Sequence, residues 1–538
     1  MKESPPAGLD GIRASPIAGL DDDRESFQRT ITNEKSSIAG LDDLESFQPT
    51  IIGDTQSAKT NDDNVLIVDW DGPDDPENPR NWSSGQKWGA TVIVSVFTFI
   101  SPVSSSMIAP SSEQLAHDFG VTNSAIVAMF TSVFVLAYAV GPLFLGPLSE
   151  AFGRARILQL SNLWYLVWNL SCGFTQNTGQ LLAFRFLAGL GGSAPFAIGG
   201  AVIGDLFSPD QRGQAIAIYS LAPNLGPVIG PIAGAWVAQN TTWRWVFWST
   251  TIADAIVQIL GTVFLKETYA PTLLERKAER IRRSMDEEKV KHTEVRTVFQ
   301  SNNLNFKAFL ARALVRPFSL FIHEPIVQLL GLYMAFLYGL LYLFITTIPS
   351  MFQDIYHQRV GASGLHYTAF GVGLIGGVQL NALVMNRVYM YFKGKNGGVG
   401  RPEFRLPNII PGTILLPIGL FLTGWTARSE IHWIVPDIGI SFVGAGIILT
   451  FQSIQTYVID AFTMHAASAL AVVTFFRSMA GFGFPLFAQP MYGALGYGRG
   501  NTVLAIVAVV FGYPAPWLLW VYGERIRDWS RYARKAAL

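Results

Sequence analysis

The chain has 538 residues, of which 50% are hydrophobic and only 14% are charged, with 39 Lys and Arg against 39 Asp and Glu. Soluble globular domains average about a quarter charged residues, so this composition argues against a soluble protein. The sequence contains no strongly basic stripe of the kind that binds nucleic acid. The single cysteine, Cys172, excludes a disulfide framework and a cysteine-rich metal site.

The N-terminal segment is polar and acidic and contains a duplication. Residues 17–22, Ile-Ala-Gly-Leu-Asp-Asp, return at 38–43, and the Glu-Ser-Phe-Gln at 25–28 returns at 45–48. Two polar copies cannot bury enough apolar area to offset the chain entropy lost on folding. We therefore predict a disordered tail over residues 1–75, with no cleavable signal peptide before the first apolar run.

Twelve apolar segments follow. A helix rises ~1.5 Å per residue, so about 20 mostly apolar residues cross the ~30 Å hydrocarbon core. The predicted spans are 88–109, 123–148, 155–174, 179–206, 211–238, 243–265, 323–349, 364–391, 405–426, 432–459, 466–493 and 499–522. The sequence thus predicts an all-α polytopic membrane protein with twelve transmembrane helices in two six-helix bundles. Its predicted parts are a tail (1–75), a first bundle (76–265), a charged central loop (266–316), a second bundle (317–522) and a basic tail (523–538).

Lysines and arginines are concentrated in one set of loops. The loops after the second, fourth, sixth and eighth spans, and the C-terminal tail, are rich in both residues. The opposite loops carry only Arg244, Arg359, Arg428 and Arg499. Because cytoplasmic loops are enriched in Lys and Arg, we predict that both termini and the central loop are cytoplasmic.

Two sets of six spans predict an internal repeat. Asp205 lies at the end of the fourth span in Ile-Gly-Asp-Leu-Phe, and Asp460 lies at the end of the tenth in Ile-Asp-Ala-Phe. Many carriers are built from such repeats. We expect the two bundles to be related by a pseudo-twofold axis along the membrane normal.

The loop after the second span combines glycines with a charge pair. Residues 146–156 read Gly-Pro-Leu-Ser-Glu-Ala-Phe-Gly-Arg-Ala-Arg. Glu150 falls at a helix carboxyl end, where the helix dipole disfavours an anion, and Arg154, four residues on, can supply a cation. Gly146 and Gly153 permit close approach and a tight reversal. We predict a gate here, the alternative being a basic loop that only fixes topology.

The fifth span contains a glycine face. Gly226, Gly230 and Gly234 recur every four residues and give a neighbouring helix a flat surface. Pro227, like the prolines around it, removes a ladder hydrogen bond and can kink the helix. We predict a role in gating, with ordinary helix packing as the alternative.

These two segments resemble motifs of the major facilitator superfamily. The loop resembles the cytoplasmic gate motif G-x-L-a-D-r-x-G-R-k, with Glu150 in place of the Asp and with Ala151 and Ala155 at basic positions. The fifth span resembles the motif associated with antiporters, with Ala222 and Pro231 replacing two glycines. The first resemblance implies a cytoplasmic gate, and the second implies antiport.

Three further segments are similar to the fungal twelve-span drug:proton antiporters. They are Asp-Pro-Glu-Asn-Pro-Arg-Asn-Trp at 75–82, Trp-Arg-Trp-Val-Phe-Trp at 243–248 and Phe-Pro-Leu-Phe at 484–487. The resemblance covers about residues 75–530. It implies the major facilitator fold and a secondary active transporter that exports drugs, toxins or secondary metabolites by proton antiport with alternating access.

Other functions remain as alternatives. A proton-coupled or facilitative importer fits the same fold, although sugar-porter signatures are missing after spans 6 and 12. A non-transporting membrane sensor is a further alternative. No nucleophile elbow, phosphate loop or His/Cys/Asp cluster indicates an enzyme. We expect no cofactor, metal or nucleic acid, and instead a small organic substrate, protons and the lipid bilayer as partners of a monomer in the plasma membrane.

Ionisable residues inside spans are candidates for coupling, because charge at membrane depth is costly. Arg185 in the fourth span matches the family's span-4 arginine, which the resemblance links to proton coupling and the substrate, with a structural pair inside the bundle as the alternative. Asp254 lies on a polar stripe of the sixth span with Thr251 and Gln258. Arginine does not release its proton. We therefore predict that either Asp254 or Asp205 carries the proton, while a structural Asp254 remains an alternative.

A polar and aromatic face marks the seventh and tenth spans. The resemblance implies that spans 1, 4, 7 and 10 line the substrate cavity. Rings and neutral amides suit an amphiphilic solute, including a cationic one, through stacking and cation–π contacts. Besides Arg185, the predicted substrate-binding residues are Gln328, Tyr338, Tyr342, Gln452 and Gln455.

Overall fold

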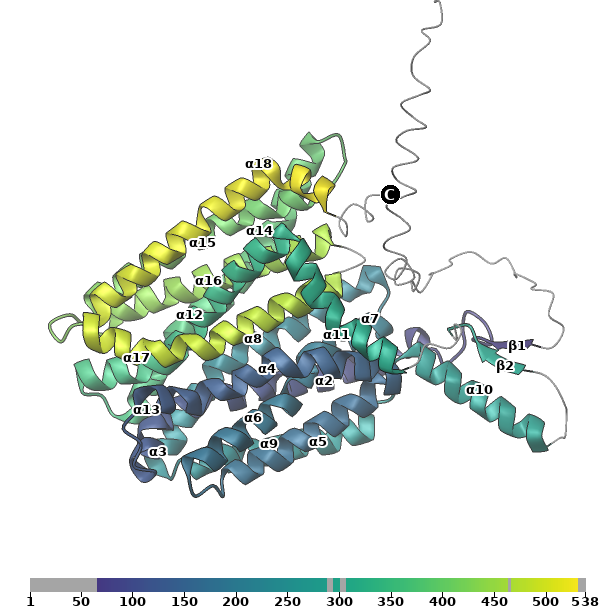
Figure 1. Ribbon diagram of the computed structural model, residues 1–538, viewed down its shortest axis with the longest axis horizontal. Coiled ribbons are helices and arrows are strands. Elements are labelled where there is room, and N and C mark those ends of the chain that lie inside the picture. Colours follow the sequence, from purple (N-terminus) through teal and green to yellow (C-terminus); the bar gives the residue numbers. More distant parts are fainter. Residues whose placement is uncertain (1–64, 288–293, 300–305, 463–465, 531–538) are drawn as a thin grey trace, which may run out of the picture. The chain divides into compact units, whose positions relative to one another are not determined.

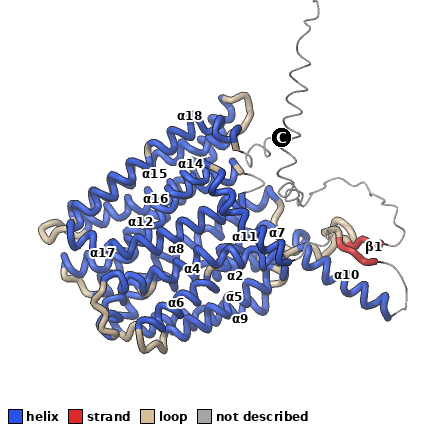
Figure 2. Tube along the Cα trace, in the orientation of Figure 1, coloured by secondary structure: helices blue, strands red, loops and turns tan. Residues whose placement is uncertain are grey.

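A computed structural model describes residues 65–287, 294–299, 306–462 and 466–530 (Figure 1). The predicted duplication at 17–48 lies outside these residues, as does the end of the basic tail. The described part is helical except for two short strands and the connecting loops (Figure 2).

The first half of the bundle contains six spans built from α2 to α9. Their bounds are α2 Ser84–Ser106, η3 Ala109–Ser111, α3 Ser112–Asp118, α4 Ser124–Phe152, α5 Arg154–Cys172, α6 Thr178–Gly192, α7 Ala194–Leu206, α8 Pro209–Asn240 and α9 Arg244–Phe264. The predicted fourth span is divided into α6 and α7 at Ser193. Pro195 follows this break, and a proline cannot donate the backbone hydrogen bond that a continuous helix needs.

The second half repeats the arrangement after the central loop. Its helices are α11 Phe306–His323, α12 Pro325–Tyr356, α13 Val360–Leu365, α14 Tyr367–Lys395, η4 Pro402–Asn408, α15 Ile409–Thr426, α16 Ile434–Ala461, α17 Ala466–Gly512 and α18 Pro514–Trp529. Gly496 interrupts α17 with a φ of 72°, which separates the predicted eleventh and twelfth spans. Glycine tolerates this left-handed conformation because it has no Cβ.

Ten helical stretches of the described residues are long and apolar enough to cross a membrane. One of them, Ser468–Trp529, contains the last two predicted spans. The more polar α5 occupies the third predicted span with 19 residues. These helices account for the twelve predicted spans.

Polar side chains begin several of these helices. Ser83 forms a reciprocal capping box with Gln86 at the start of α2. The side chains of Asn123 and Asn177 accept hydrogen bonds from the first backbone N–H groups of α4 and α6. Such caps satisfy donors that a helix leaves unpaired, so these residues help to set where each span begins.

The two halves share an apolar core. Phe134, Val135 and Tyr138 of α4 belong to the same buried cluster as residues of α12 and α16. In the described ranges two hydrogen bonds join the halves. Ser105 Oγ and Tyr342 OH lie 2.9 Å apart, and the Gly361 N–H donates to Gln239 Oε1 at 2.7 Å. Ser105 and Gln239 lie in the last turns of α2 and α8, so both bonds involve the ends of helices remote from α10.

A small unit packs beside the other end of the first half (Figure 1). It consists of β1 (Val65–Val68), the parallel strand β2 (Glu294–Thr297) and α10 (Ala270–Glu287). We call it the clamp. Val68, Ala278 and Val295 form its apolar core. Because β1 is ordered, the predicted disordered tail over 1–75 extends too far toward its carboxyl end.

Ionic contacts stabilise the clamp. Lys277 Nζ lies 2.6 Å from Asp71 Oδ1 and 3.6 Å from Asp75 Oδ2. Backbone N–H groups of Asp71 and Glu77 donate to the Asp75 carboxylate, and they lower its pKa together with the Lys277 charge, against the effect of burial. The Arg280 guanidinium contacts Glu77 at 2.8 Å. The segment before α2 is thus tied to the central loop.

Candidate functional site

The predicted gate loop holds a cluster of charges around Arg154. Arg154 begins α5, and its guanidinium donates to Ser149 Oγ at 2.8 Å. The same guanidinium lies 3.7 Å from Glu150 Oε1 and 3.5 Å from Asp205 Oδ2. The Arg154 side chain is 10% exposed, while those of Asp205 and Glu150 are 25% and 47% exposed. The structure therefore brings Glu150, Arg154 and Asp205 together and leaves Glu150 accessible.

Gly153 makes this cluster possible. Its φ of 101° reverses the chain between α4 and α5, and a Cβ at this position would collide with the Glu267 carboxylate. Both features require glycine. Gly146 lies inside α4, where a Cβ would meet no atom within 4 Å. The expected close approach at Gly146 is not present in this structure.

Glu267 completes the gate cluster, and our sequence analysis missed it. Its Oε1 accepts hydrogen bonds from the backbone N–H groups of Arg154, Thr268 and Tyr269 at 2.9–3.0 Å. The residue is 7% exposed. Tyr269 also places its ring 4.6 Å from the Arg154 guanidinium. The available signal was a carboxylate two residues after Leu265, the last apolar residue of the sixth span.

A related pair occupies the equivalent place in the second half. Arg405 Nε lies 2.9 Å from Asp460 Oδ2, and its guanidinium lies 4.2 Å from the ring of Tyr389. Asp205 and Asp460 thus each end a span and each contact an arginine at the start of the preceding span. This correspondence agrees with the predicted repeat. Arg405 was not among the residues predicted from the sequence.

The glycine face of α8 packs directly on α2. Added Cβ atoms at Gly226, Gly230 and Gly234 would meet Pro102, Val103 and Met107 closer than any real side chain allows. Pro227 lies inside the same helix, which continues through it. These glycines let the backbones of α8 and α2 come into contact.

Arg185 is fully buried inside the first half and donates four hydrogen bonds to backbone carbonyls. Its guanidinium donates to the carbonyls of Phe130, Ser104 and Ser105 at 2.9–3.0 Å. It also lies over the ring of Phe134 at 4.8 Å. Within the part of the chain that the structure describes, no carboxylate forms an ion pair with it. Its observed contacts therefore fix α6 against α2 and α4.

Asp254 is also fully buried, at the interface of α9 with α5. Both carboxylate oxygens accept from Asn162 Nδ2, at 3.0 and 3.1 Å, and the same amide donates to Gln258 Oε1. The predicted polar stripe of α9 therefore faces protein at Thr251 and Asp254. Asp205 and Asp254 belong to different clusters, and only Asp205 contacts the gate.

The structure does not bring all of the predicted substrate residues together. Tyr338 and Tyr342 are neighbours, with ring centroids 5.2 Å apart. On α16, Gln452 accepts from Asn381 at 2.9 Å, and Gln455 is half-buried. Gln328 lies in the first turn of α12, where its amide donates to the carbonyls of Phe321 and Ile322. Ten residues, or about 15 Å of helix, separate Gln328 from Tyr338, so the structure does not bring it to the tyrosines.

Arg477 on α17 is a third residue, after Glu267 and Arg405, that was not predicted from the sequence. Its guanidinium lies 5.1 Å from the ring of Tyr338 and 5.3 Å from that of Phe451. Gly481, one turn further on, packs against Tyr338 and against Val135 of the first half. An arginine within the eleventh apolar span was a visible signal, since charge at membrane depth is rare.

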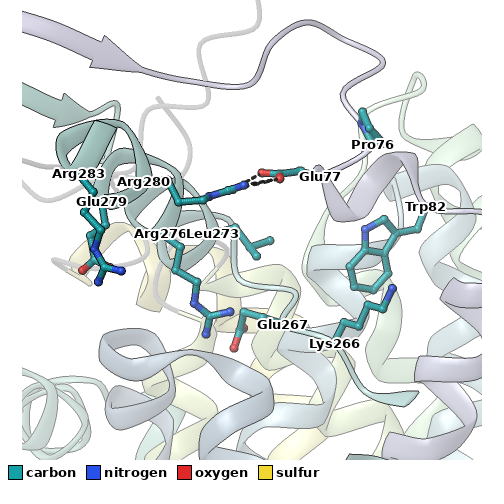
Figure 3. A pocket seen from close by; sticks show the side chains of 10 residues that line it. All are labelled: Pro76, Glu77, Trp82, Lys266, Glu267, Leu273, Arg276, Glu279, Arg280 and Arg283. Carbon is teal, nitrogen blue, oxygen red and sulfur yellow. Dashed lines mark hydrogen bonds and ion pairs between the residues drawn. The ribbon is translucent and has the colours of Figure 1, made fainter. Parts of the chain in front are cut away.

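A cleft of about 560 Å³ lies between the clamp and the end of α9 (Figure 3). Side chains of both signs line it, including Lys266, Arg276, Glu267 and Glu279. Figure 3 shows Trp82 beside Lys266, and the Arg280–Glu77 pair near the opposite wall. Glu267 therefore connects this cleft to the gate cluster. No group of three or more His, Cys, Asp or Glu side chains in the described ranges is placed to hold a metal ion.

Two six-span halves with matching Arg–Asp pairs define a polytopic membrane carrier. The model of the Major Facilitator Superfamily matches residues 94–485, which is most of the chain. The chain belongs to this superfamily, and it is a multi-pass membrane transporter.

Curated relatives agree with this assignment. The chain is 45% identical to "Efflux pump vrtL" of Penicillium aethiopicum over 87% of its own length and 91% of that protein. It is 43% identical to "MFS-type transporter penM" of Penicillium rubens, over 87% and 90% of the two chains. It is 41% identical to "Efflux pump radE" of Floropilus chiversii, over 87% and 86%.

Solved structures show the same fold. The xylose transporter XylE from E. coli, in a partially occluded inward open conformation, matches with a TM-score of 0.60 and 16% identity, over 82% of this chain and 98% of that one. A bacterial homolog of the human lysosomal transporter Spinster, inward-facing and unoccupied, matches with a TM-score of 0.57 and 14% identity, over 83% and 99%.

Proposed function

We propose that this protein exports small organic molecules by proton antiport, with both termini in the cytoplasm of a plasma-membrane carrier. The gate cluster around Arg154 is the observation that carries the proposal. It joins the ends of four spans through α4, α5, α7 and the segment after α9. The efflux pumps among the relatives support export, and the glycine face of α8 supports antiport.

The contacts between the halves support an alternating-access cycle. The described hydrogen bonds across the interface join Ser105 to Tyr342 and Gln239 to Gly361, at the ends of α2 and α8 remote from the gate cluster. The described contacts of Arg154 stay within the first half and the segment directly after α9, and no hydrogen bond in the described ranges joins Glu150 to α17. This state closes the outer side in the proposed orientation. Glu150 remains accessible to a partner on α17 when the cytoplasmic side closes.

The proton is carried by Asp205 or by Asp254. Asp205 contacts Arg154 loosely, at 3.5 Å, so a proton on Asp205 removes one anion that holds the gate arginine. Asp254 is buried deeper, but its described bonds stay between α5 and α9. Contact with the gate therefore favours Asp205, whereas depth favours Asp254. Arg185, which donates to carbonyls of α2 and α4, acts by holding α6 in place.

The test is export from cells that lack other pumps, using a panel of labelled anionic, neutral and cationic solutes. Export that stops when a proton uncoupler is added supports antiport, provided that the cells keep their ATP. In reconstituted vesicles, an imposed pH gradient should drive the same solutes. Export that ignores both the uncoupler and the gradient would contradict the proposal, and uptake down a gradient would favour an importer.

A further inference from the structure

Most buried or half-buried charges of the second half have a partner of opposite charge. Asp437 contacts His366, Asp460 contacts Arg405, and Glu403 contacts Arg527, each within 2.9 Å. Arg477 differs from these groups. In the described part of the chain it has neither an ion pair nor a hydrogen bond, and its Nε is buried without a partner.

Arg477 lies deep within the bundle. It follows the start of α17 by eleven residues, which corresponds to about 16 Å of helix and about half of the hydrocarbon thickness. A guanidinium has five N–H donors and stays protonated. Leaving such a group without an anion at this depth is costly, and the structure maintains here a positive charge that no described residue neutralises.

The surroundings of Arg477 come from both halves. Tyr338 of α12 and Phe451 of α16 present their rings to the guanidinium. Val135 of α4 packs beside Gly481 on the next turn of α17. Arg477 therefore lies where the two halves meet, as a substrate site in an alternating-access carrier must.

We propose that Arg477 binds the anionic group of the exported solute, and that this solute is an aromatic organic acid carrying a carboxylate or a phenolate. The forked N–H groups of arginine match a carboxylate with two parallel hydrogen bonds. The rings of Tyr338 and Phe451 border the same place and suit an aromatic body. A fixed positive charge here opposes binding of a cation, which departs from the cationic solute allowed by the sequence analysis.

This assignment rests on the proposed export function for its direction, but not for its chemistry. Export of an anion moves negative charge outward, and entry of a proton moves positive charge inward. An inside-negative membrane potential favours both movements. The binding preference itself exists whether or not protons drive the cycle, so binding and transport can be tested separately.

The test is equilibrium binding to the purified full-length protein in lipid nanodiscs, with empty nanodiscs as the blank. The fluorescent probes are 9-anthracenecarboxylate, its uncharged carboxamide and the cation 9-(aminomethyl)anthracene. The carboxylate should bind at least about tenfold more tightly than the carboxamide, because charge-assisted hydrogen bonds add to the same aromatic contact. The ammonium probe should bind most weakly.

Variants locate the preference. Arg477→Gln should weaken binding of the carboxylate by roughly 10- to 100-fold and leave the carboxamide within about twofold. Arg477→Lys keeps the charge but loses the fork, so it should give an intermediate affinity and serves if the Gln variant does not fold. Arg387→Gln removes an exposed arginine from α14 and should change neither affinity.

Three results would overturn the inference. The carboxylate could bind the parent protein no more tightly than the carboxamide, the ammonium probe could bind best, or Arg477→Gln could weaken the carboxamide as much as the carboxylate. The last result would make Arg477 a purely structural contact between α17, α12 and α16. A selective carboxylate site in a protein that shows no proton-driven export would leave this inference standing and reject the proposed function.

Discussion

Arg185 and Arg477 have the same charge within apolar spans, but the protein surrounds them differently. Arg185 is 0% exposed and donates to carbonyls of α2 and α4. Arg477 is half-buried and faces two rings, with no hydrogen bond in the described ranges. Saturation by the backbone makes an arginine a structural tie, whereas an arginine without an acceptor can bind a solute. The first half therefore uses its buried charge for rigidity, and the second keeps its charge for recognition.

Replacing each arginine in turn should give the largest difference, which is a difference in the stability of the folded protein. Arg185→Leu leaves several buried carbonyls without donors and should destabilise the protein by about 3 kcal/mol or more. Arg477→Gln should lower stability by less than about 1 kcal/mol, because it removes ring contacts at a half-buried site. Thermal unfolding in detergent, followed with the yield of monodisperse protein, measures both. Equal losses would show that both arginines are structural ties.

The gate cluster gives the next largest expected effect. Glu267→Ala removes the acceptor for three backbone N–H groups at the start of α5 and after α9, and should slow transport about tenfold or more. Glu267→Gln keeps an oxygen there and should slow transport less. Glu150→Gln should also reduce the rate, by a smaller factor, since the Glu150 side chain is 47% exposed.

Transport rates corrected for the amount of protein at the membrane measure this series. Normal rates in Glu150→Gln would show that the loop is only a topology signal. A greater loss in Glu150→Gln than in Glu267→Ala would contradict the ranking by burial. Thermal unfolding gives the contrast with Arg185, because Glu150→Gln should slow transport while leaving thermal unfolding near that of the parent, whereas Glu267→Ala should lower both.

The next prediction concerns proton coupling, which we assign to an aspartate of the first half and not to Asp460 of the second. Asp205→Asn and Asp254→Asn test the two proposed proton carriers, and Asp460→Asn is the matched control in the second half. Export driven by an imposed pH gradient across vesicles should fall severalfold in the variant that lacks the carrier. In the other two variants, export should respond to the pH gradient as it does in the parent. A parental response in all three would reject both assignments.

The sequence predicted the fold well because the membrane imposes simple rules. A run of about 20 apolar residues must be a helix in lipid, since every backbone group needs an internal partner. The family model and the fold neighbours confirm the twelve-span architecture, and the Arg154–Asp205 and Arg405–Asp460 pairs agree with the repeat inferred from sequence.

The sites were harder to predict because they depend on contacts between distant segments. Glu267 appeared to belong to a solvated loop, and only its N–H partners place it in the gate. Gln328 shares a helix face with Tyr338, but helix periodicity says nothing of the α11 carbonyls that bind its amide. Arg477 was visible in the sequence as a charge within a span, but the sequence does not show that no described residue forms an ion pair with it.

The clamp provides the smallest expected effect and the last test of how structural charges differ from functional ones. The carboxylate of Asp75 accepts from the N–H groups of Asp71 and Glu77, and these bonds, with Lys277 nearby, lower its pKa in the folded protein. A lowered carboxylate pKa stabilises the clamp above the usual Asp value of about 4, and that contribution is lost as the pH falls through the lowered pKa. Asp75→Asn should therefore destabilise the packing of β1 by about 1 kcal/mol at neutral pH. The stability of the clamp in this variant should no longer fall at acid pH as it does in the parent. Protease cleavage between β1 and α2 measures the loosening. Binding of the anthracene probes should not change, because the clamp lies outside the spans, and a changed affinity would show that the clamp communicates with the site at Arg477.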